Sequence, residues 1–102
     1  MYVDGKGVPQ DYKEAVKWYR LAADQGEASA QSNLGYMYSN GHGVLQDNVM
    51  AHMWYNIGSA NSSGNSGINR DIIAKKMTPA DISKAQAMAR ECMNSGYTKC
   101  GY

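Results

Sequence analysis

Apolar residues recur along this chain at intervals of three and four positions, the spacing that places side chains on one face of an α-helix. Two segments carry the same order of residues on that face, two aromatics followed by two small residues: Ala15, Trp18, Tyr19, Ala22 and Ala23, then Ala51, Trp54, Tyr55, Gly58 and Ser59. We predict a helix in each segment. The small pair would let a neighbouring helix approach closely, and the aromatics would fill the space beside it.

A further helix is predicted between these two, over residues 27–40. Its apolar stripe, again at helical spacing, consists of Ala30, Leu34, Gly35 and Tyr38. Gly26 and Gly41 mark its limits, because glycine adopts positive φ without a side-chain penalty. After Gly41, Gly43 is expected to let the chain reverse, and Val44 to fill the space beneath the turn.

Two more helices are predicted in the last third of the chain. One covers about residues 68–77 and follows a polar, glycine-rich segment at 60–67, which predicts a mobile loop. The other begins at Thr78 and ends near Gly96. Its predicted core residues are Ile82, Ala85, Ala89 and either Cys92 or Met93.

Capping signals mark the starts of three of the predicted helices. Asp11 is followed three residues later by Glu14, which is the pattern of a capping box. Asp47 is expected to begin the helix that contains the second aromatic pair. Thr78 precedes Pro79, a residue that suits the first position of a helix.

The first nineteen residues recur at 37–55, where ten of the nineteen positions are identical at an offset of 36. A period of this length is that of two short antiparallel helices with their turns. We therefore predict an all-α fold, an α/α solenoid of antiparallel helix pairs with about five helices in a single domain. Residues 1–26 would form a partial first repeat, 27–60 a complete second repeat, and 61–102 a divergent C-terminal helix pair with a tail.

The shared positions resemble the signature of the Sel-1-like repeat family, relatives of the tetratricopeptide repeats. The resemblance is carried by Gly5, Gly7, Trp18 and Tyr19 in the first copy and by Leu34, Gly35, Tyr38, Gly41, Gly43, Trp54 and Tyr55 in the second. A plain tetratricopeptide repeat lacks the G-x-G-V element. The closing segment RDIIAKKMTPADISKAQAMAREC is similar to that of many bacterial members of the family, which implies a bacterial protein.

This resemblance implies a non-enzymatic adaptor that binds a protein or peptide on the concave face of the solenoid, which the first helix of each pair lines. The candidate contacts on this face are Ser32, Asn33, Tyr36, Ser39 and Asn40. Arg70 and Lys84 are candidates on a separate ground: the last forty residues carry a net charge of +3, which would steer an acidic partner, and the alternative is a solvated helix face. Tyr36 is the main candidate, because a large amphipathic ring among polar neighbours is typical of an adaptable peptide-binding surface. The alternative is that Tyr36 packs on the adjacent helix.

A second hypothesis is self-assembly. The first copy lacks most of its first helix, so the solenoid would expose a face that a missing partner helix would cover. A homodimer through this N-terminal end would cover that face.

Charge and hydropathy narrow the choice of partner. Ten Lys and Arg against nine Asp and Glu give a net charge of +1, without the basic excess of a nucleic-acid-binding protein. No apolar run approaches the ~20 residues of a membrane span. The start of the chain also lacks the basic and apolar regions of a signal peptide. We therefore expect a soluble chain that does not bind nucleic acid and does not insert into a membrane.

No motif for a cofactor, a metal or catalysis is found. The glycine loops lack the third glycine of a dinucleotide fingerprint, where Gln10 and Gln46 stand instead. His42 and His52 are ten residues apart, and we expect them in a loop and on a solvent-facing helix position, too dispersed for a metal site. Some cysteine-rich members of the family are associated with penicillin binding, but no serine here precedes a lysine by three residues. A hydrolytic enzyme is therefore the remotest alternative.

Cys92 and Cys100 are separated by seven residues, with Gly96 between them to turn the chain. This spacing favours a disulfide that ties the tail to the last helix, and with it a periplasmic or secreted setting. The alternative is a pair of reduced cysteines, one packed and one exposed, which would leave a cytoplasmic setting open.

Overall fold

A computed structural model describes residues 11–61 and 64–101 of the chain. In this part the chain forms helices and no strands. The five helices are α1 (Tyr12–Ala23), α2 (Ala28–Asn40), α3 (Asn48–Ala60), α4 (Ser66–Ala74) and α5 (Pro79–Asn94). The predicted all-α class is confirmed.

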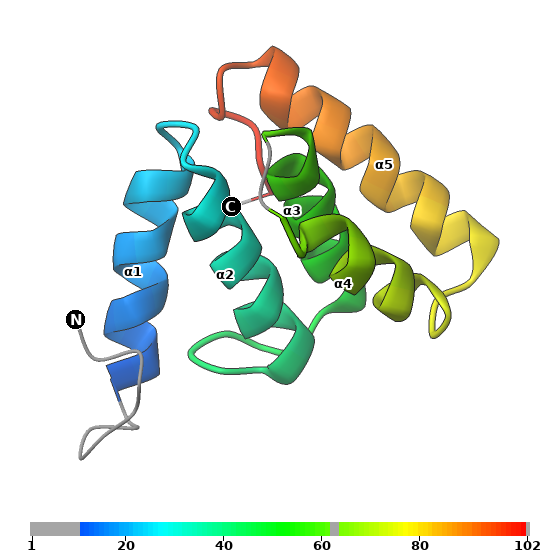
Figure 1. The fold of residues 1–102 in the computed structure, drawn as a ribbon, viewed down its shortest axis with the longest axis horizontal. Coiled ribbons are helices and arrows are strands. Elements are labelled where there is room, and N and C mark those ends of the chain that lie inside the picture. Colours follow the sequence, from blue (N-terminus) through cyan, green and yellow to red (C-terminus); the bar gives the residue numbers. More distant parts are fainter. Residues whose placement is uncertain (1–10, 62–63, 102) are drawn as a thin grey trace.

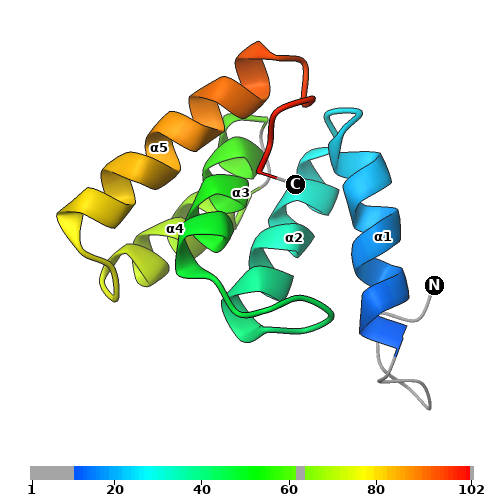
Figure 2. The same cartoon turned by 180° about the vertical axis from the view of Figure 1, so that it is seen from behind.

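The helices lie side by side in chain order from α1 to α3, with α4 and α5 both packed on α3 (Figures 1 and 2). The most extensive contact between two helices is that of α2 with α3, which run antiparallel and are joined by the glycine loop. Helix α3 is the centre of the core: Met53, Trp54 and Ile57 have no exposed surface. An α-helix covered on all sides is expected to be apolar all round, and eight of the thirteen residues of α3 are buried.

Two glycines allow the close approach of α3 to its neighbours. A Cβ at Gly35 of α2 would lie 2.7 Å from the ring of Tyr55, so this ring lies directly on the α2 backbone. A Cβ at Gly58 of α3 would lie 2.6 Å from Oγ of Ser66 and 3.3 Å from the backbone nitrogen of Ser32. The predicted role of the small residues is thereby confirmed for Gly58.

The first copy of the aromatic pair is not buried like the second. Trp18 is 52 % exposed and its Nε1 donates a hydrogen bond to Glu14, whereas Trp54 is fully buried. The prediction that Trp18 belongs to the core was therefore wrong. The physical reason is that α3 packs against α2, α4 and α5, while the contacts of α1 with other helices are concentrated on α2.

Other local predictions also need correction. His52 is 3 % exposed and not solvent-facing, because α3 is covered on several sides. Asp11 precedes α1 without a capping hydrogen bond from its side chain. Ile82 is only partly buried, although Ala85, Ala89 and Cys92 are buried as predicted.

Helix α4 begins at Ser66 and ends at Ala74, earlier at both ends than predicted. Ser66 is buried and donates a hydrogen bond from Oγ to the carbonyl of Tyr55, which fixes the first turn. At the other end, Thr78 takes an extended conformation, with ψ of 157°, as expected for the residue before a proline. Residues 62–63, within the predicted loop, lie outside the described residues.

Two predicted caps are confirmed. The Asp47 carboxylate accepts hydrogen bonds from the backbone N–H groups of Val49 and Met50. Thr78 Oγ1 accepts one from the N–H of Asp81. At the end of α2, Gly41 takes a left-handed conformation with φ of 69°, as predicted for a helix end.

The tail after α5 is fastened to the rest of the molecule. Cys92 and Cys100 form the predicted disulfide, with a Cα–Cα distance of 4.4 Å, and both are buried. Between them, Tyr97 takes a positive φ of 67°, which is uncommon for a residue with a side chain.

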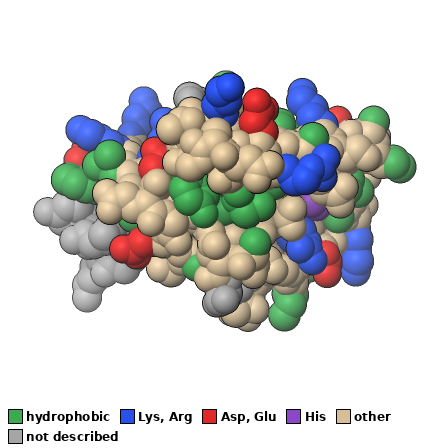
Figure 3. All heavy atoms as spheres, turned by 90° about the horizontal axis from the view of Figure 1, so that it is seen from above, with side chains coloured by type: hydrophobic (Ala, Val, Ile, Leu, Met, Phe, Trp, Pro, Cys, Tyr) green, Lys and Arg blue, Asp and Glu red, His purple; other side chains and the backbone are tan. Residues whose placement is uncertain are grey.

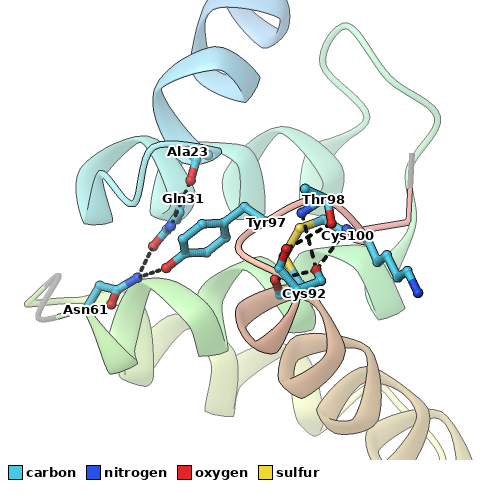
Figure 4. Close-up of a disulfide and its surroundings, with 9 residues drawn as sticks. Ala23, Gln31, Asn61, Cys92, Tyr97, Thr98 and Cys100 are labelled. Atoms are coloured by element: carbon cyan, nitrogen blue, oxygen red, sulfur yellow. Dashed lines mark hydrogen bonds between the residues drawn. A yellow bond between two sulfur atoms is a disulfide. The ribbon is translucent and has the colours of Figure 1, made fainter.

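Figure 4 shows the hydrogen-bond chain that the tail joins. Asn61 donates from Nδ2 to the Tyr97 hydroxyl at 2.9 Å and to Oε1 of Gln31 at 2.8 Å. Gln31 in turn donates from Nε2 to the carbonyl of Ala23. The ends of α1 and α3, the start of α2 and the tail are thus connected by one partly buried polar network.

Candidate functional site

A groove with a volume of about 340 Å³ lies beside α2. We call it the α2 groove. Its lining residues are Ser29, Ser32, Asn33, Tyr36, Tyr55, Gly64, Asn65 and Asn69. These come from α2, from α3 and from the segment that begins α4, so the groove exists only in the folded domain.

The packing of small residues explains the position of the groove. At Gly58 the start of α4 and the backbone of α2 both pack closely on α3, and the Ser66 hydrogen bond to the Tyr55 carbonyl holds the start of α4 in place. As a result, Asn65 and Asn69 face the groove across from the α2 side chains. Tyr55, only 4 % exposed, contributes to the lining from α3.

Tyr36 is the large exposed side chain of the groove, with 51 % of its surface accessible. Its ring meets the His42 ring edge-on, with centroids 5.8 Å apart. His42 in turn stacks on Tyr12 at 4.4 Å. Aromatic contacts of this kind restrict a ring without burying it, so Tyr36 is held in place while one side stays open to a ligand.

The lining of the α2 groove carries no formal charge at neutral pH. Its polar groups are amides and hydroxyls, which both donate and accept hydrogen bonds. Burial, and then the neighbouring Tyr36, raise the pKa of the Tyr55 hydroxyl above its usual value of 10.0, so this hydroxyl is protonated at neutral pH. Such a lining suits a neutral polar chain more than an anion or a cation.

A second hollow of about 320 Å³ lies between α1 and α2. It shares Ser29 and Asn33 with the α2 groove, and Trp18 of α1 borders it. The two hollows therefore form one continuous surface on both sides of Asn33.

The structure brings three of the predicted contact residues together, since Ser32, Asn33 and Tyr36 line the α2 groove. Ser39 and Asn40 do not line it, and Asn40 donates from Nδ2 to the carbonyl of Tyr36 within α2.

The two predicted cations lie outside the groove lining. Arg70 donates to Asn56 at 2.9 Å and pairs with Asp71 at 3.2 Å. Lys84 is exposed on α5. Neither is placed to contact a ligand that fills the α2 groove alone.

Tyr55, Asn65 and Asn69 also line the groove and are not among the contact residues predicted from the sequence. The sequence predicts Tyr55 on the packed face of its helix and Asn65 in a loop. Only Asn65 has a local signal, the run of amide and hydroxyl side chains before Ile68. No such signal marks Tyr55 or Asn69.

Within residues 11–61 and 64–101, no three His, Cys, Asp or Glu side chains gather where they could hold a metal ion. No described helix is long and apolar enough to cross a membrane.

Helices α1, α2 and α3, packed side by side with a groove on the face of α2, have the architecture of an α-solenoid. The Sel1 repeat family matches the sequence at residues 1–27 and 28–63, which is more than half of the chain. The chain belongs to the Sel1 repeat family. Sel1 repeats are generally modules for protein–protein interaction. No curated protein matches the chain.

Proposed function

We propose that this chain is an adaptor that holds a short peptide segment of a partner protein in the α2 groove. The observation that carries the proposal is the half-exposed ring of Tyr36 among uncharged amides and hydroxyls from three segments of the fold. A peptide main chain presents alternating N–H and C=O groups, and Asn33, Asn65 and Asn69 supply both complementary groups. Tyr36 supplies a ring against which a side chain can pack.

The test is capture of partners from an extract by the immobilised protein. Tyr36→Ala should weaken capture about tenfold or more, because truncating a central aromatic of an interface often costs that much. The fold should be unaffected, since half of the ring is already in water.

Ile72→Ala is the matched control. Ile72 is 50 % exposed, as Tyr36 is, but it does not line the groove. Partners that bind the wild type and the Ile72 variant equally, but not the Tyr36 variant, would support the proposal. Equal capture by all three proteins would remove Tyr36 from the site.

Self-association is a second candidate. It is favoured by the exposure of Trp18, because Trp54, at the equivalent position of the second repeat, is fully buried. A second copy of the chain that covered Trp18 would bury it as the neighbouring helices bury Trp54 on α3. Sedimentation of the wild type and of Trp18→Ala tests it: a dimer that the substitution abolishes supports this candidate, and a monomer at all concentrations contradicts it.

We also propose that the chain works in an oxidising compartment. The support is the buried disulfide between Cys92 and Cys100, a bond that persists in secreted and periplasmic proteins. Thiol counting on protein isolated from its native cells checks this, and two free thiols would contradict it.

A further inference from the structure

A second groove lies between α1 and the glycine loop that joins α2 to α3. Its volume is about 550 Å³, and its lining includes Lys13, Val16, Lys17, Leu21 and Val44. It continues into a hollow of about 430 Å³ that shares Lys13, Gly43 and Val44 and adds Leu45. We call the two together the α1 groove.

Contacts between the loop and α1 build this groove. At Gly43, with φ of +77°, a Cβ would lie 2.5 Å from the carbonyl oxygen of Tyr12, so the loop lies directly on the first turn of α1. The stacked rings of Tyr12 and His42 hold the same two segments together. The groove is therefore formed before any ligand binds, which reduces the entropic cost of binding.

One edge of the α1 groove is basic. Lys13, Lys17 and Arg20 follow one another at i, i+4 and i+7, and therefore lie on one face of α1. Both lysines are exposed. Arg20 donates a hydrogen bond from Nη2 to the Tyr38 hydroxyl, and Asp24 is the one carboxylate in the lining. Three cations and one carboxylate give this lining a net charge of +2.

The remainder of the lining is apolar. Val16 is 3 % exposed and Val44 is partly buried against the core, so they form the floor. Leu21 is 50 % exposed and Leu45 is 90 % exposed. On the face away from the glycine loop, Figure 3 shows Lys or Arg side chains beside hydrophobic ones at the end of the molecule that α1 forms. An apolar floor with a basic edge fits a ligand that carries apolar and acidic groups together.

We propose that the α1 groove binds an acidic, apolar segment of a partner protein. From Lys13 to Asp24 the groove follows about 16 Å of α1 at 1.5 Å per residue, which is the length of about five residues of extended chain. Apolar side chains of the segment pack on Val16, Val44, Leu21 and Leu45. Its carboxylates face Lys13 and Lys17.

Charge decides between this occupant and a second copy of the chain. Two α1 grooves facing each other would bring Lys13 and Lys17 of one copy against the same cations of the other, and like charges at close range repel. A nucleic acid would satisfy the cations but would leave Leu21 and Leu45 without apolar partners. An acidic, apolar peptide satisfies both parts of the lining.

The test uses a displayed library of random peptides, selected on the intact wild-type protein and separately on the double variant Lys13→Glu/Lys17→Glu. Selection on the wild type should enrich peptides that combine Asp or Glu with apolar residues. An enriched acidic peptide should bind the double variant about tenfold or more weakly, because two attractive pairs become repulsive. Selection on the double variant should enrich basic peptides instead.

Two further variants separate this site from the α2 groove. Lys84→Glu changes an exposed lysine outside the α1 groove and should leave the acidic peptide bound, and so should Tyr36→Ala. Leu45→Asp should weaken it, and Leu45 is too exposed for this change to unfold the domain. Loss of binding in Tyr36→Ala alone would place the peptide in the α2 groove and overturn the proposal.

Three other outcomes would overturn it as well. They are the absence of acidic residues among the enriched peptides, tighter binding of a single-stranded oligonucleotide than of any peptide, and a dimer in sedimentation that Lys13→Glu/Lys17→Glu disrupts or strengthens. The first removes the charge argument, the second makes the site one for nucleic acid, and the third makes it an interface between copies. None of them bears on the role of Tyr36.

Discussion

At the scale of single residues, this fold depends on two helical glycines, at positions where no side chain would fit. Gly35 and Gly58 are helical, and neither needs an unusual backbone conformation. Each is small because a side chain or another backbone occupies the space where a Cβ would stand. Helix propensity alone would favour alanine at both positions, so packing decides the residue here.

Gly35→Ala should destabilise the domain. The added methyl would stand 2.7 Å from the buried Tyr55 ring, and overpacking of this kind costs roughly 1–3 kcal/mol. The higher helix propensity of alanine offsets at most about 1 kcal/mol of this loss. Urea unfolding measures the difference. Gly64→Ala is the control, because its Cβ would meet no atom within 4 Å, and a loss as large as that of Gly35→Ala would contradict the packing argument.

His52 should make stability depend on pH. Burial, and then the Arg70 guanidinium, lower the pKa of His52 below its usual 6.5, while the Asp71 carboxylate acts in the opposite direction. As the pH falls through about 6.5, His52 therefore becomes protonated in the unfolded chain while it stays neutral in the folded chain. The free energy of unfolding should be level above that pH and fall below it, by at most about 1.4 kcal/mol per pH unit from this group.

His52→Val should flatten this dependence. Val16, buried in α1, stands at the equivalent position of the first repeat. Valine at position 52 therefore reproduces a residue that is already buried at this position of the repeat. Among the described residues, no group forms a hydrogen bond with the buried Nδ1 of His52, so the change breaks no bond there. Unfolding curves at several pH values check it, and an unchanged slope would assign the titration to another group.

At the scale of helices, the sequence predicted the elements well because its signals are local. The stripe Ala30, Leu34, Gly35 and Tyr38 and the caps at Asp47 and Thr78 depend on neighbours a few residues away. The failures concern burial. Trp18 and Trp54 share one sequence context, and only the number of helices packed around each distinguishes them.

The three helix caps should contribute differently to stability, because Asp47 and Thr78 accept hydrogen bonds from the first turn and Asp11 does not. Thr78→Ala and Asp47→Ala each remove an oxygen that accepts from a backbone N–H of the first turn, and each should cost about 1 kcal/mol. Asp11→Ala removes a side chain without such a bond and should cost clearly less. Thermal unfolding of the three variants compares them, and equal losses would refute this ranking.

At the scale of the whole molecule, the candidate site could be predicted only in part. Ser32, Asn33 and Tyr36 were found because all three lie on one helix face. Asn65 and Asn69 come from more than twenty residues further along the chain, and they reach the groove because α4 and α2 both pack on α3 at Gly58. No pattern along the sequence reports a contact of that range.

Reduction of the disulfide should weaken the whole domain and not only the tail. In the chain-entropy account a loop this short contributes about 2–3 kcal/mol. The tail also carries Tyr97, whose hydroxyl joins the network through Asn61 and Gln31. Urea unfolding with and without reductant measures the effect. Cys92→Ser/Cys100→Ser is the control, since its stability should match that of the reduced protein and should not respond to reductant.

The contact between Gly43 and Tyr12 also has a consequence for cooperativity. Repeat proteins unfold as one unit only when the coupling between neighbouring repeats is strong enough. Here the loop of the second repeat rests on the first turn of α1, so it adds to the coupling that α2 alone gives. A larger residue at Gly43 strains the α2–α3 loop, because φ is +77°, and also presses on α1. Hydrogen exchange should record the earliest loss of protection in α1, which has fewer contacts with the rest of the domain. Gly43 thereby helps to determine whether the domain unfolds as one cooperative unit or as two.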